Sequence, residues 1–229
     1  MMTIPITKEG RTYIIAVLLI AALLSIFSFI YTFLALKIMV LLSWIVFILV
    51  INFFRDPERK TPVDACSIIS PADGKVIEVK KVKEGRYLHR EVTRVGIFMS
   101  LFDVHVNRAP VKGVIEYVNY NPGVYIPAFR EKASLDNEQM SIGIAMGSQD
   151  ESQKELRVMI KLIAGYIARR IVLWKNLYDK IQQGERVGMI KFGSRVEMYL
   201  PQEVDLYIRE GDKVKAGETI IAKTKDMHD

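Results

Sequence analysis

"MIKFGSRVEMYLP", residues 189–201, is the stretch on which both the fold and the function depend. Most of its residues favour β-strands, and a proline ends the run. A glycine and a serine interrupt it at positions 193 and 194. Glycine weakens a strand and usually marks a bulge or a close approach of backbones. Either the chain turns a corner here, or the Gly193–Ser194 peptide bond itself reacts.

Short apolar runs separated by turn residues continue on both sides of this stretch. Their alternation and β-branching predict a mostly β, antiparallel fold of the barrel or sandwich type. The runs are "GKVIEVKKV" (74–82), "TRVGIFMSLF" (93–102), "GVIEYVNYN" (113–121), "QMSIGIAMG" (139–147) and "ELRVMIKLI" (155–163). "IAGYIARRIVLW" (163–174) fits a strand or a short helix equally well.

The C-terminal stretch "EVDLYIREGDKVKAGETIIAKTK" (203–225) predicts three short strands with turns at Gly211–Asp212 and Gly217. This pattern resembles the barrel-sandwich hybrid of biotinyl and lipoyl carrier domains. Those domains carry a modified lysine in a Met-Lys signature, which the stretch lacks. It therefore favours a hybrid-like β edge without an attached cofactor.

The N-terminal region is hydrophobic, and Lys37 is its single charge between Tyr13 and Phe54. Thr12–Leu36 is long enough to cross a ~30 Å hydrocarbon core as a helix, and Ile38–Phe54 lies at the short end of that range. We expect a membrane-associated helical hairpin and linker over residues 1–60, with Lys37 near its tip, and a soluble domain over 61–229. A single tilted span followed by an interfacial helix is the alternative.

Basic residues flank the hydrophobic region on both sides and favour a cytoplasmic location for both ends, with the soluble domain on the cytoplasmic side of the cell membrane. They are Lys8 and Arg11 before it, and Arg55, Arg59 and Lys60 after it. The formal charge of +6 also predicts attraction to an anionic lipid surface. No recognition helix, RNA-binding platform or zinc finger can be read, so nucleic acid is not an expected partner. One cysteine and three scattered histidines predict no disulfide and no metal site.

Three polar motifs accompany Gly193–Ser194, and each has a purely structural interpretation. "SPADGKV" (70–76) places Asp73 before a glycine, which is a common turn signal. "FMSLFDVHVNRAP" (98–110) places His105 with Asn107 and Arg108 where a strand ends, and "KASLDNEQ" (132–139) reads as a solvated loop. The sequence has no Gly-x-Ser-x-Gly elbow, so an ordinary serine hydrolase is poorly supported.

A serine that follows glycine can attack the preceding carbonyl, because glycine allows the strained turn that the attack requires. The amide becomes an ester, and removal of the serine Cα proton then eliminates the ester and breaks the chain. Hydrolysis of the resulting dehydroalanine leaves a ketone, a pyruvoyl group, at the new N-terminus.

Six segments in order resemble the phosphatidylserine decarboxylase family in its short prokaryotic (archaeal-type) form. They are "SPADGKV", "IFMSLFDVHVNRAPVKG", "KASLDNEQ", "IAGYIARRIV", "ERVGMIKFGSRVEMYLP" and "GDKVKAGETIIA", which span residues 70–222. The resemblance implies that the precursor cuts itself between Gly193 and Ser194. The products would be a β chain (1–193) and an α chain (194–229) that carries the pyruvoyl group, joined as a heterodimer.

The same resemblance places Asp73 on the acidic residue of the family's self-cleavage triad and His105 on the first of two histidines. Arg108 stands where long-form members have the second histidine, and arginine is a poor base. We therefore expect His105, oriented or charged by Asp73, to act as the base. Any oligomer beyond the heterodimer stays open.

The implied reaction converts phosphatidylserine into phosphatidylethanolamine, a step of phospholipid biosynthesis. The pyruvoyl ketone forms a Schiff base with the substrate amine and takes up the electron pair left at Cα when CO2 leaves. Histidine suits the proton transfer that follows, so His105 is the expected donor. Candidate substrate contacts are Arg108, Lys132, Asn137, Arg169 and Arg170.

Two other functions remain open from the sequence. "GDKVKAGETIIA" together with the hydrophobic hairpin also fits a membrane-anchored β-barrel adaptor without any chemistry. A pyruvoyl enzyme for a soluble amino acid is less favoured, because such a substrate needs no membrane hairpin.

Overall fold

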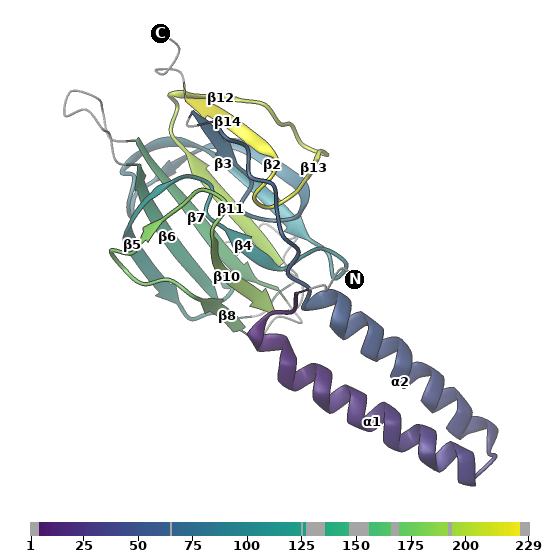
Figure 1. The fold of residues 1–229 in the computed structure, drawn as a ribbon. Helices are drawn as coiled ribbons and strands as arrows, with labels where there is room; N and C mark the ends of the chain where they lie inside the picture. The colour runs from purple at the N-terminus through teal and green to yellow at the C-terminus, as the bar shows by residue number, and fades with distance from the viewer. Residues whose placement is uncertain are drawn as a thin grey trace. The chain divides into compact units, whose positions relative to one another are not determined.

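The computed structural model describes residues 5–64, 66–124, 126, 136–146, 156–165, 170–191 and 194–224. The chain divides into two compact units, Met1–Glu58 and Arg59–Asp229. The first unit is helical and the second consists mainly of β-strands (Figure 1). The predicted fold class, mostly β after two apolar helices, is therefore confirmed.

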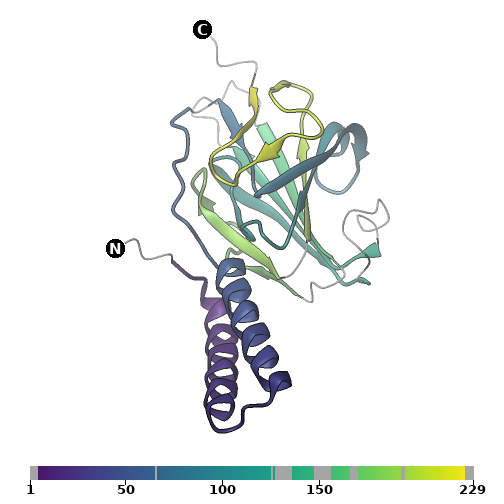
Figure 2. The same cartoon turned by 90° about the vertical axis from the view of Figure 1, so that its right-hand side faces the viewer.

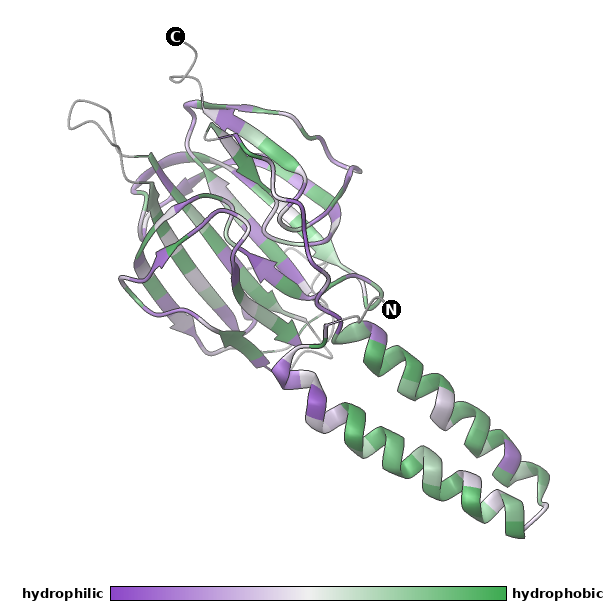
Figure 3. Ribbon diagram, viewed as in Figure 1, coloured by the Kyte–Doolittle hydropathy of each residue, from purple (hydrophilic) through white to green (hydrophobic). Residues whose placement is uncertain are grey.

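The first unit contains a short 3-10 turn, η1 (Lys8–Gly10), and two helices, α1 (Arg11–Ile30) and α2 (Leu34–Phe53). The helices run in opposite directions, and the Trp44 indole of α2 donates a hydrogen bond to the Ser25 hydroxyl of α1 (Figure 2). Both helices are hydrophobic along nearly their whole length (Figure 3). By length and composition, each could cross a membrane.

The helix boundaries differ from those that the sequence predicted. The first helix ends at Ile30 because Tyr31 is extended, at φ −114° and ψ 119°, and Phe33 is extended as well. The second helix begins at Leu34, so Lys37 lies in its first turn. Tyr31–Phe33 therefore connect the two helices, and Lys37 lies near this tip, as expected.

The second unit is built from three sheets. The largest has the strand order β13-β2-β3-β11-β7-β6-β5-β9 and curls into a half-barrel (Figures 1 and 2), and the two smaller sheets have the orders β4-β10-β8 and β1-β14-β12. The strands are β1 (Ser67–Ile69), β2 (Gly74–Glu84), β3 (Arg90–Met99), β4 (Val106–Arg108), β5 (Gly113–Asn121), β6 (Gln139–Met146), β7 (Leu156–Ala164), β8 (Arg170–Leu173), β9 (Lys180–Ile181), β10 (Arg186–Lys191), β11 (Ser194–Leu200), β12 (Val204–Leu206), β13 (Lys213–Val214) and β14 (Ile220–Thr224). The ambiguous segment 163–174 thus contributes residues 163–164 to β7 and 170–173 to β8.

One apolar core lies between the three sheets. Each sheet contributes fully buried side chains to it, for example Val196 of β11, Ile190 of β10 and Ile221 of β14. The C-terminal pattern is also confirmed, because β12, β13 and β14 are separated by turns in which Gly211 and Gly217 have φ +97° and +77°. Those left-handed conformations favour glycine.

The Gly193–Ser194 interruption falls between two strands and not inside one. β10 ends at Lys191 in the small sheet β4-β10-β8, and β11 begins at Ser194 in the large sheet. The chain therefore passes from one sheet to another at this point. Of the two interpretations that the sequence left open, the corner agrees with this change of sheet, and the reaction of the bond stays a prediction.

Candidate functional site

Ser194 is the first residue of β11, a central strand of the large sheet. It lies opposite Met99, the last residue of β3, on one side and Ala164, the last residue of β7, on the other. Its side chain is fully buried, and its Oγ lies 3.2 Å from the Met99 sulfur. The side chain of Ser194, the predicted nucleophile, is therefore buried at the end of its strand, next to an uncharged thioether.

His105 lies beside the strand that leads to Ser194. It is fully buried, it directly precedes β4, and its carbonyl accepts a hydrogen bond of 3.4 Å from the amide of Ile190 in β10. Its Nδ1 lies 3.0 Å from the carbonyl oxygen of Asp103. A carbonyl can only accept, so Nδ1 carries the proton in the neutral ring and Nε2 keeps the lone pair that a base needs.

Asn107 is a site residue to which the sequence assigned no role. Strand alternation puts its side chain on the same side of β4 as His105. Its Nδ2 lies 3.8 Å from the Met99 sulfur and 3.4 Å from the Pro71 carbonyl oxygen. The Met99 sulfur therefore contacts both the Ser194 hydroxyl and the Asn107 amide. The period-2 spacing of His105 and Asn107 was the signal that could have identified it.

Asn137, predicted as a substrate contact, lies next to the register partner of Ser194. Its Nδ2 donates to the carbonyls of Ile126 and Ala164 at 2.7 and 2.6 Å, and its Oδ1 accepts from the Ile126 amide at 2.9 Å. The side chain is fully buried. These bonds fix the end of β7 where it pairs with Ser194.

Asp73 lies in the turn before β2 and is almost fully buried. Its Oδ2 accepts a hydrogen bond of 2.7 Å from Arg59, and its Oδ1 accepts one of 2.7 Å from the Ala216 amide. Within the described part of the chain, the oxygen atom that lies 3.0 Å from His105 Nδ1 is the backbone carbonyl oxygen of Asp103. The two carboxylate oxygens of Asp73 bond instead to Arg59 and to the Ala216 amide. The turn still reaches the site, because the Pro71 carbonyl contacts Asn107.

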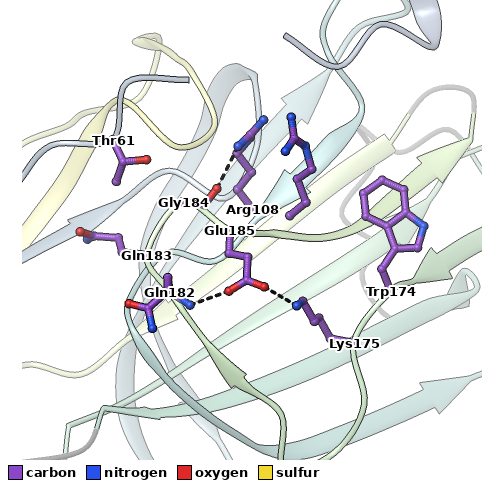
Figure 4. Close-up of a pocket in the computed structure, with 9 residues that line it drawn as sticks. Thr61, Arg108, Trp174, Lys175, Gln182, Gln183, Gly184 and Glu185 are labelled. Atoms are coloured by element: carbon purple, nitrogen blue, oxygen red, sulfur yellow. Dashed lines mark hydrogen bonds and ion pairs between the residues drawn. The ribbon is translucent and has the colours of Figure 1, made fainter. Parts of the chain in front are cut away.

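Arg108 points away from His105, as strand alternation requires. Its Nη1 donates to the Gly184 carbonyl at 3.0 Å, and its Cδ packs against Gly217. It lines a pocket of about 490 Å³ at the beginning of β10, which is the end of that strand farther from Ser194 (Figure 4). In the same pocket the Glu185 carboxylate accepts a hydrogen bond from the Gln182 amide and pairs with Lys175.

The remaining candidates divide into two groups. Gly193, Lys132 and Arg169 lie outside the residues that the structure describes. Arg170 is exposed at the beginning of β8, where it pairs in register with Lys191 at the end of β10. Arg170 therefore lies beside the end of β10, the strand that leads to the Gly193–Ser194 bond.

A cluster of buried charges lies on the other face of β11, and the sequence analysis did not identify it. Arg195, directly after Ser194, has 2 % of its side chain exposed and pairs with Glu78 of β2 and with Glu197, whose side chain is fully buried. Arg94 of β3 also pairs with Glu78. The Tyr199 hydroxyl donates to Glu197 at 2.6 Å. We call these five residues the charged face of β11.

The pKa values of this face reflect burial and pairing. Burial acts to raise the pKa of Glu78, but hydrogen bonds from Arg94 and Arg195 outweigh it and hold that pKa at about 2. Burial raises the pKa of the Tyr199 phenol, and the neighbouring Glu197 carboxylate adds to the effect. Burial lowers the pKa of Lys161, which lies 4.0 Å from Glu197. Glu78 is therefore ionised at neutral pH, and the Tyr199 phenol stays protonated.

The arrangement suits attack by a hydroxyl on the adjacent peptide bond. It supplies a buried serine where the chain changes sheets, an imidazole whose Nδ1 is engaged by the Asp103 carbonyl, and strands that hold both in place. Among the described residues, no group of three or more His, Cys, Asp or Glu side chains could hold a metal ion.

Comparison with known proteins points to one family. The sequence model of the phosphatidylserine decarboxylase family matches residues 46–222. A phosphatidylserine decarboxylase proenzyme of Carboxydothermus hydrogenoformans is 45% identical over 186 residues, which cover 81% of this chain and 84% of the relative. Proenzymes of the same name from Chlorobium phaeobacteroides and Geotalea uraniireducens are 40% and 37% identical over 217 residues each; these cover 95% of this chain, and 99% and 95% of the respective relatives.

Proposed function

Because this chain belongs to the phosphatidylserine decarboxylase family, we propose that it is a proenzyme that cuts its own Gly193–Ser194 bond and then decarboxylates phosphatidylserine to phosphatidylethanolamine. The observation that carries the proposal is the position of Ser194. It is a fully buried serine at the junction of two sheets, directly after a glycine.

Self-cleavage uses groups that the chain already contains. The Ser194 hydroxyl attacks the Gly193 carbonyl carbon, the C–N bond breaks, and the serine nitrogen takes a proton, so that the amide becomes an ester. A base then removes the Cα proton of Ser194, and the ester leaves as the carboxylate of Gly193. The dehydroalanine that remains takes up water and releases ammonia. We assign the base to His105 Nε2, because Nδ1 is engaged by the Asp103 carbonyl.

The surroundings of Ser194 suit the pyruvoyl group that this cleavage would leave. The hydroxyl lies against a thioether, and the position is fully buried, so a neutral ketone can stay shielded from water there. When formed, the group supplies a ketone that takes up the electron pair freed by loss of CO2. The protein then has to orient the substrate and return a proton to its Cα.

His105 also suits this second proton transfer, because imidazole titrates near neutral pH and the side chain is held beside β10. We propose Asp73 as a positioning residue. Its bonds to Arg59 and to the Ala216 amide hold the turn whose Pro71 carbonyl contacts Asn107. Asn137 holds the end of β7 against Ser194 in the same way.

Contacts to the anionic head group remain proposals for the basic residues that the sequence singled out. Arg170 has the best support, since it is exposed and pairs in register with Lys191 near the reacting bond. Arg108 faces the pocket of Figure 4, and Lys132 and Arg169 lie outside the described residues. A substrate with a net negative head group would bind a basic site better than its neutral product does.

Intact mass spectrometry of the purified full chain tests the cleavage. The proposal predicts two polypeptides, residues 1–193 and 194–229, the second with a keto group in place of its amino terminus. A Ser194→Ala variant should remain one inactive chain of about 26.2 kDa. An uncut wild-type chain without any ketone would remove the proposal and favour the adaptor function. A Ser194→Ala variant that still decarboxylates lipid would show that the mechanism is wrong.

We further propose that the two apolar helices hold the chain in the cell membrane with Arg59–Asp229 on the cytoplasmic side. Cys66 provides the test, because it is the single cysteine, it lies in the second unit and it is partly exposed. A membrane-impermeant maleimide should label Cys66 in inside-out vesicles and not in right-side-out vesicles. The reverse pattern would place the second unit on the outer side.

A further inference from the structure

The ends of five neighbouring strands of the large sheet lie side by side, and Ser194 is one of these end residues. Ser194 pairs with the last residues of β3 and β7, and β6 begins opposite the end of β7. The last residue of β5, Asn121, pairs with Gln139, the first residue of β6. The described residues at these strand ends, including the turn after β3, therefore lie on the same side of the sheet as Ser194. We call this side the Ser194 edge.

The turn after β3 presents two large apolar side chains at this edge. Leu101 and Phe102 are 45% and 68% exposed and follow Met99, the register partner of Ser194, after one intervening residue. The turn is held from within, since the Asp103 carboxylate accepts hydrogen bonds of 2.7 Å from both the amide and the hydroxyl of Ser100. Exposed apolar side chains at the tip of a rigid turn are unfavourable in water and indicate a surface that contacts another apolar phase.

Further apolar side chains, and two basic ones, lie at the Ser194 edge. Tyr120 and Val124, at the end of β5, are 52% and 56% exposed. Arg170, which is exposed, and Lys191 lie directly opposite each other in the β8–β10 ladder, so two basic residues are neighbours at this edge. The described acidic groups of the edge are Asp103, which is engaged in its turn, Glu138, which is buried, and Asp136, which is exposed.

We propose that the Ser194 edge docks onto the lipid bilayer, with Leu101 and Phe102 entering the apolar layer and Arg170 and Lys191 facing anionic head groups. A bilayer is the partner that accepts apolar tips flanked by cations, and aromatic side chains are favoured at its interface. Two apolar helices precede the second unit by only a short linker, so a membrane that holds them keeps this unit within reach. The inference extends the proposed function, because it explains how a lipid head group would reach a buried serine.

The same turn connects docking to the site. The Asp103 carboxylate shapes the segment that carries Leu101 and Phe102, and the Asp103 carbonyl lies 3.0 Å from His105 Nδ1. Contact with lipid would therefore stabilise the turn that orients the base. The edge is then a surface for the bilayer and a support for His105.

The chain offers a matched control at the opposite edge. Leu177 and Tyr178 are also adjacent and are 43% and 73% exposed. The Tyr178 amide donates to the carbonyl of Ile115, near the beginning of β5, so this turn lies at the other end of that strand. The two pairs match in size and exposure and differ in their distance from Ser194.

The experiment uses the full chain and measures kcat/KM on two substrates: phosphatidylserine in vesicles with phosphatidylcholine, and monomeric dihexanoyl phosphatidylserine. For the variant Leu101→Asp with Phe102→Asp, we expect the ratio of vesicle to monomer activity to fall at least tenfold. The variant Leu177→Asp with Tyr178→Asp should change that ratio less than twofold. An equal loss on both substrates, or equal ratios for both variants, would overturn the docking proposal.

A second measurement does not depend on activity. In a background that carries both Trp44→Phe and Trp174→Phe, a single tryptophan is placed by Phe102→Trp or by Tyr178→Trp, and vesicles of brominated phosphatidylcholine serve as quencher. Quenching at position 102 and none at position 178 would support docking, and no quenching at either would overturn it. If the wild-type chain decarboxylates neither substrate and the Phe102→Trp chain is still quenched, the proposed function is removed and the docking stays intact.

Discussion

The two faces of β11 are both buried, but they are buried in opposite ways. On one face Ser194, Val196, Met198 and Leu200 point into the apolar core between the sheets. On the other face Arg195, Glu197 and Tyr199 belong to the charged face, together with Glu78 and Arg94. Alternation along one strand therefore places a reactive serine on an apolar side and a set of ion pairs on the other.

The difference shows how the strand could keep its place after the chain is cut. Core packing is independent of chain continuity, and so are ion pairs between neighbouring strands. Arg195 would belong to the α chain and Glu78 to the β chain, so their pair would join the two products directly beside the new terminus. We infer that the core face carries the chemistry and that the charged face fixes its position.

The largest expected effect tests the core face. His105→Asn should lower turnover by about 10²- to 10⁴-fold, because it removes the proton-transferring group. His89→Asn is the matched control. His89 is exposed at φ +51°, a conformation that asparagine tolerates, so turnover should not change. Self-cleavage is scored separately on gels, to separate the two roles of the base. Unchanged turnover in His105→Asn would remove this residue from the mechanism.

A smaller effect tests the charged face. Arg195→Met leaves Glu78 and Glu197 with one buried partner fewer and should lower the free energy of unfolding by about 3–5 kcal/mol. Arg90→Met is the control, since the Arg90–Glu203 pair also joins the two prospective chains, at 2.9 Å, but is exposed. It should lower that free energy by less than about 1 kcal/mol. Urea denaturation of the full chain in detergent measures both, and equal losses would contradict the proposed role of the charged face.

Much of this comparison could be predicted from the sequence, and the reason is local. The alternation in "SRVEMYLP" and the glycine before it are enough to predict a strand that begins after a break. The three C-terminal strands and their glycine turns could be predicted for the same reason. The glycines at 211 and 217 are needed at positive φ, and that requirement is visible in the sequence.

The charged face could not be predicted, because it depends on pairing between distant strands. Nothing in the local sequence shows that Glu78 lies beside Arg195, or that the Gly96 backbone leaves room for the Arg195 guanidinium. The position of Asp73 could not be predicted either. Its partner Arg59 lies 14 residues earlier and the Ala216 amide 143 residues later, so only the folded chain brings them together.

The pH dependence of the free energy of unfolding distinguishes the charged face of β11 from its core face. The pKa of Glu78 is about 2 in the folded chain, below its ordinary value of 4.5, so its pairing stabilises the fold fully above about pH 4.5. That contribution, about 3 kcal/mol, is lost as the pH falls toward 2. The difference in unfolding free energy between wild type and Glu78→Gln should therefore shrink over this range. Val196→Ala, on the core face, should show a difference that does not vary with pH over this range, because the valine side chain carries no titratable group.

The smallest expected effect concerns the loop that covers the charged face. The Glu84 carboxylate accepts hydrogen bonds from the amides of Arg86, Tyr87 and Leu88 at 2.8, 2.8 and 2.6 Å. Burial alone would raise the pKa of Glu84, but these amides lower it. Leu88 and Tyr87 pack in one apolar cluster with Tyr199 of β11, so the loop shields that face from water.

Glu84→Gln keeps one acceptor oxygen and should lower the free energy of unfolding by about 1 kcal/mol. Amide hydrogen exchange should become faster at residues 86–88, while self-cleavage stays at the wild-type rate, because the loop lies on the face away from Ser194. Slower self-cleavage in this variant would mean that the charged face takes part in the chemistry, and the division of β11 into a reacting face and a holding face would then be wrong.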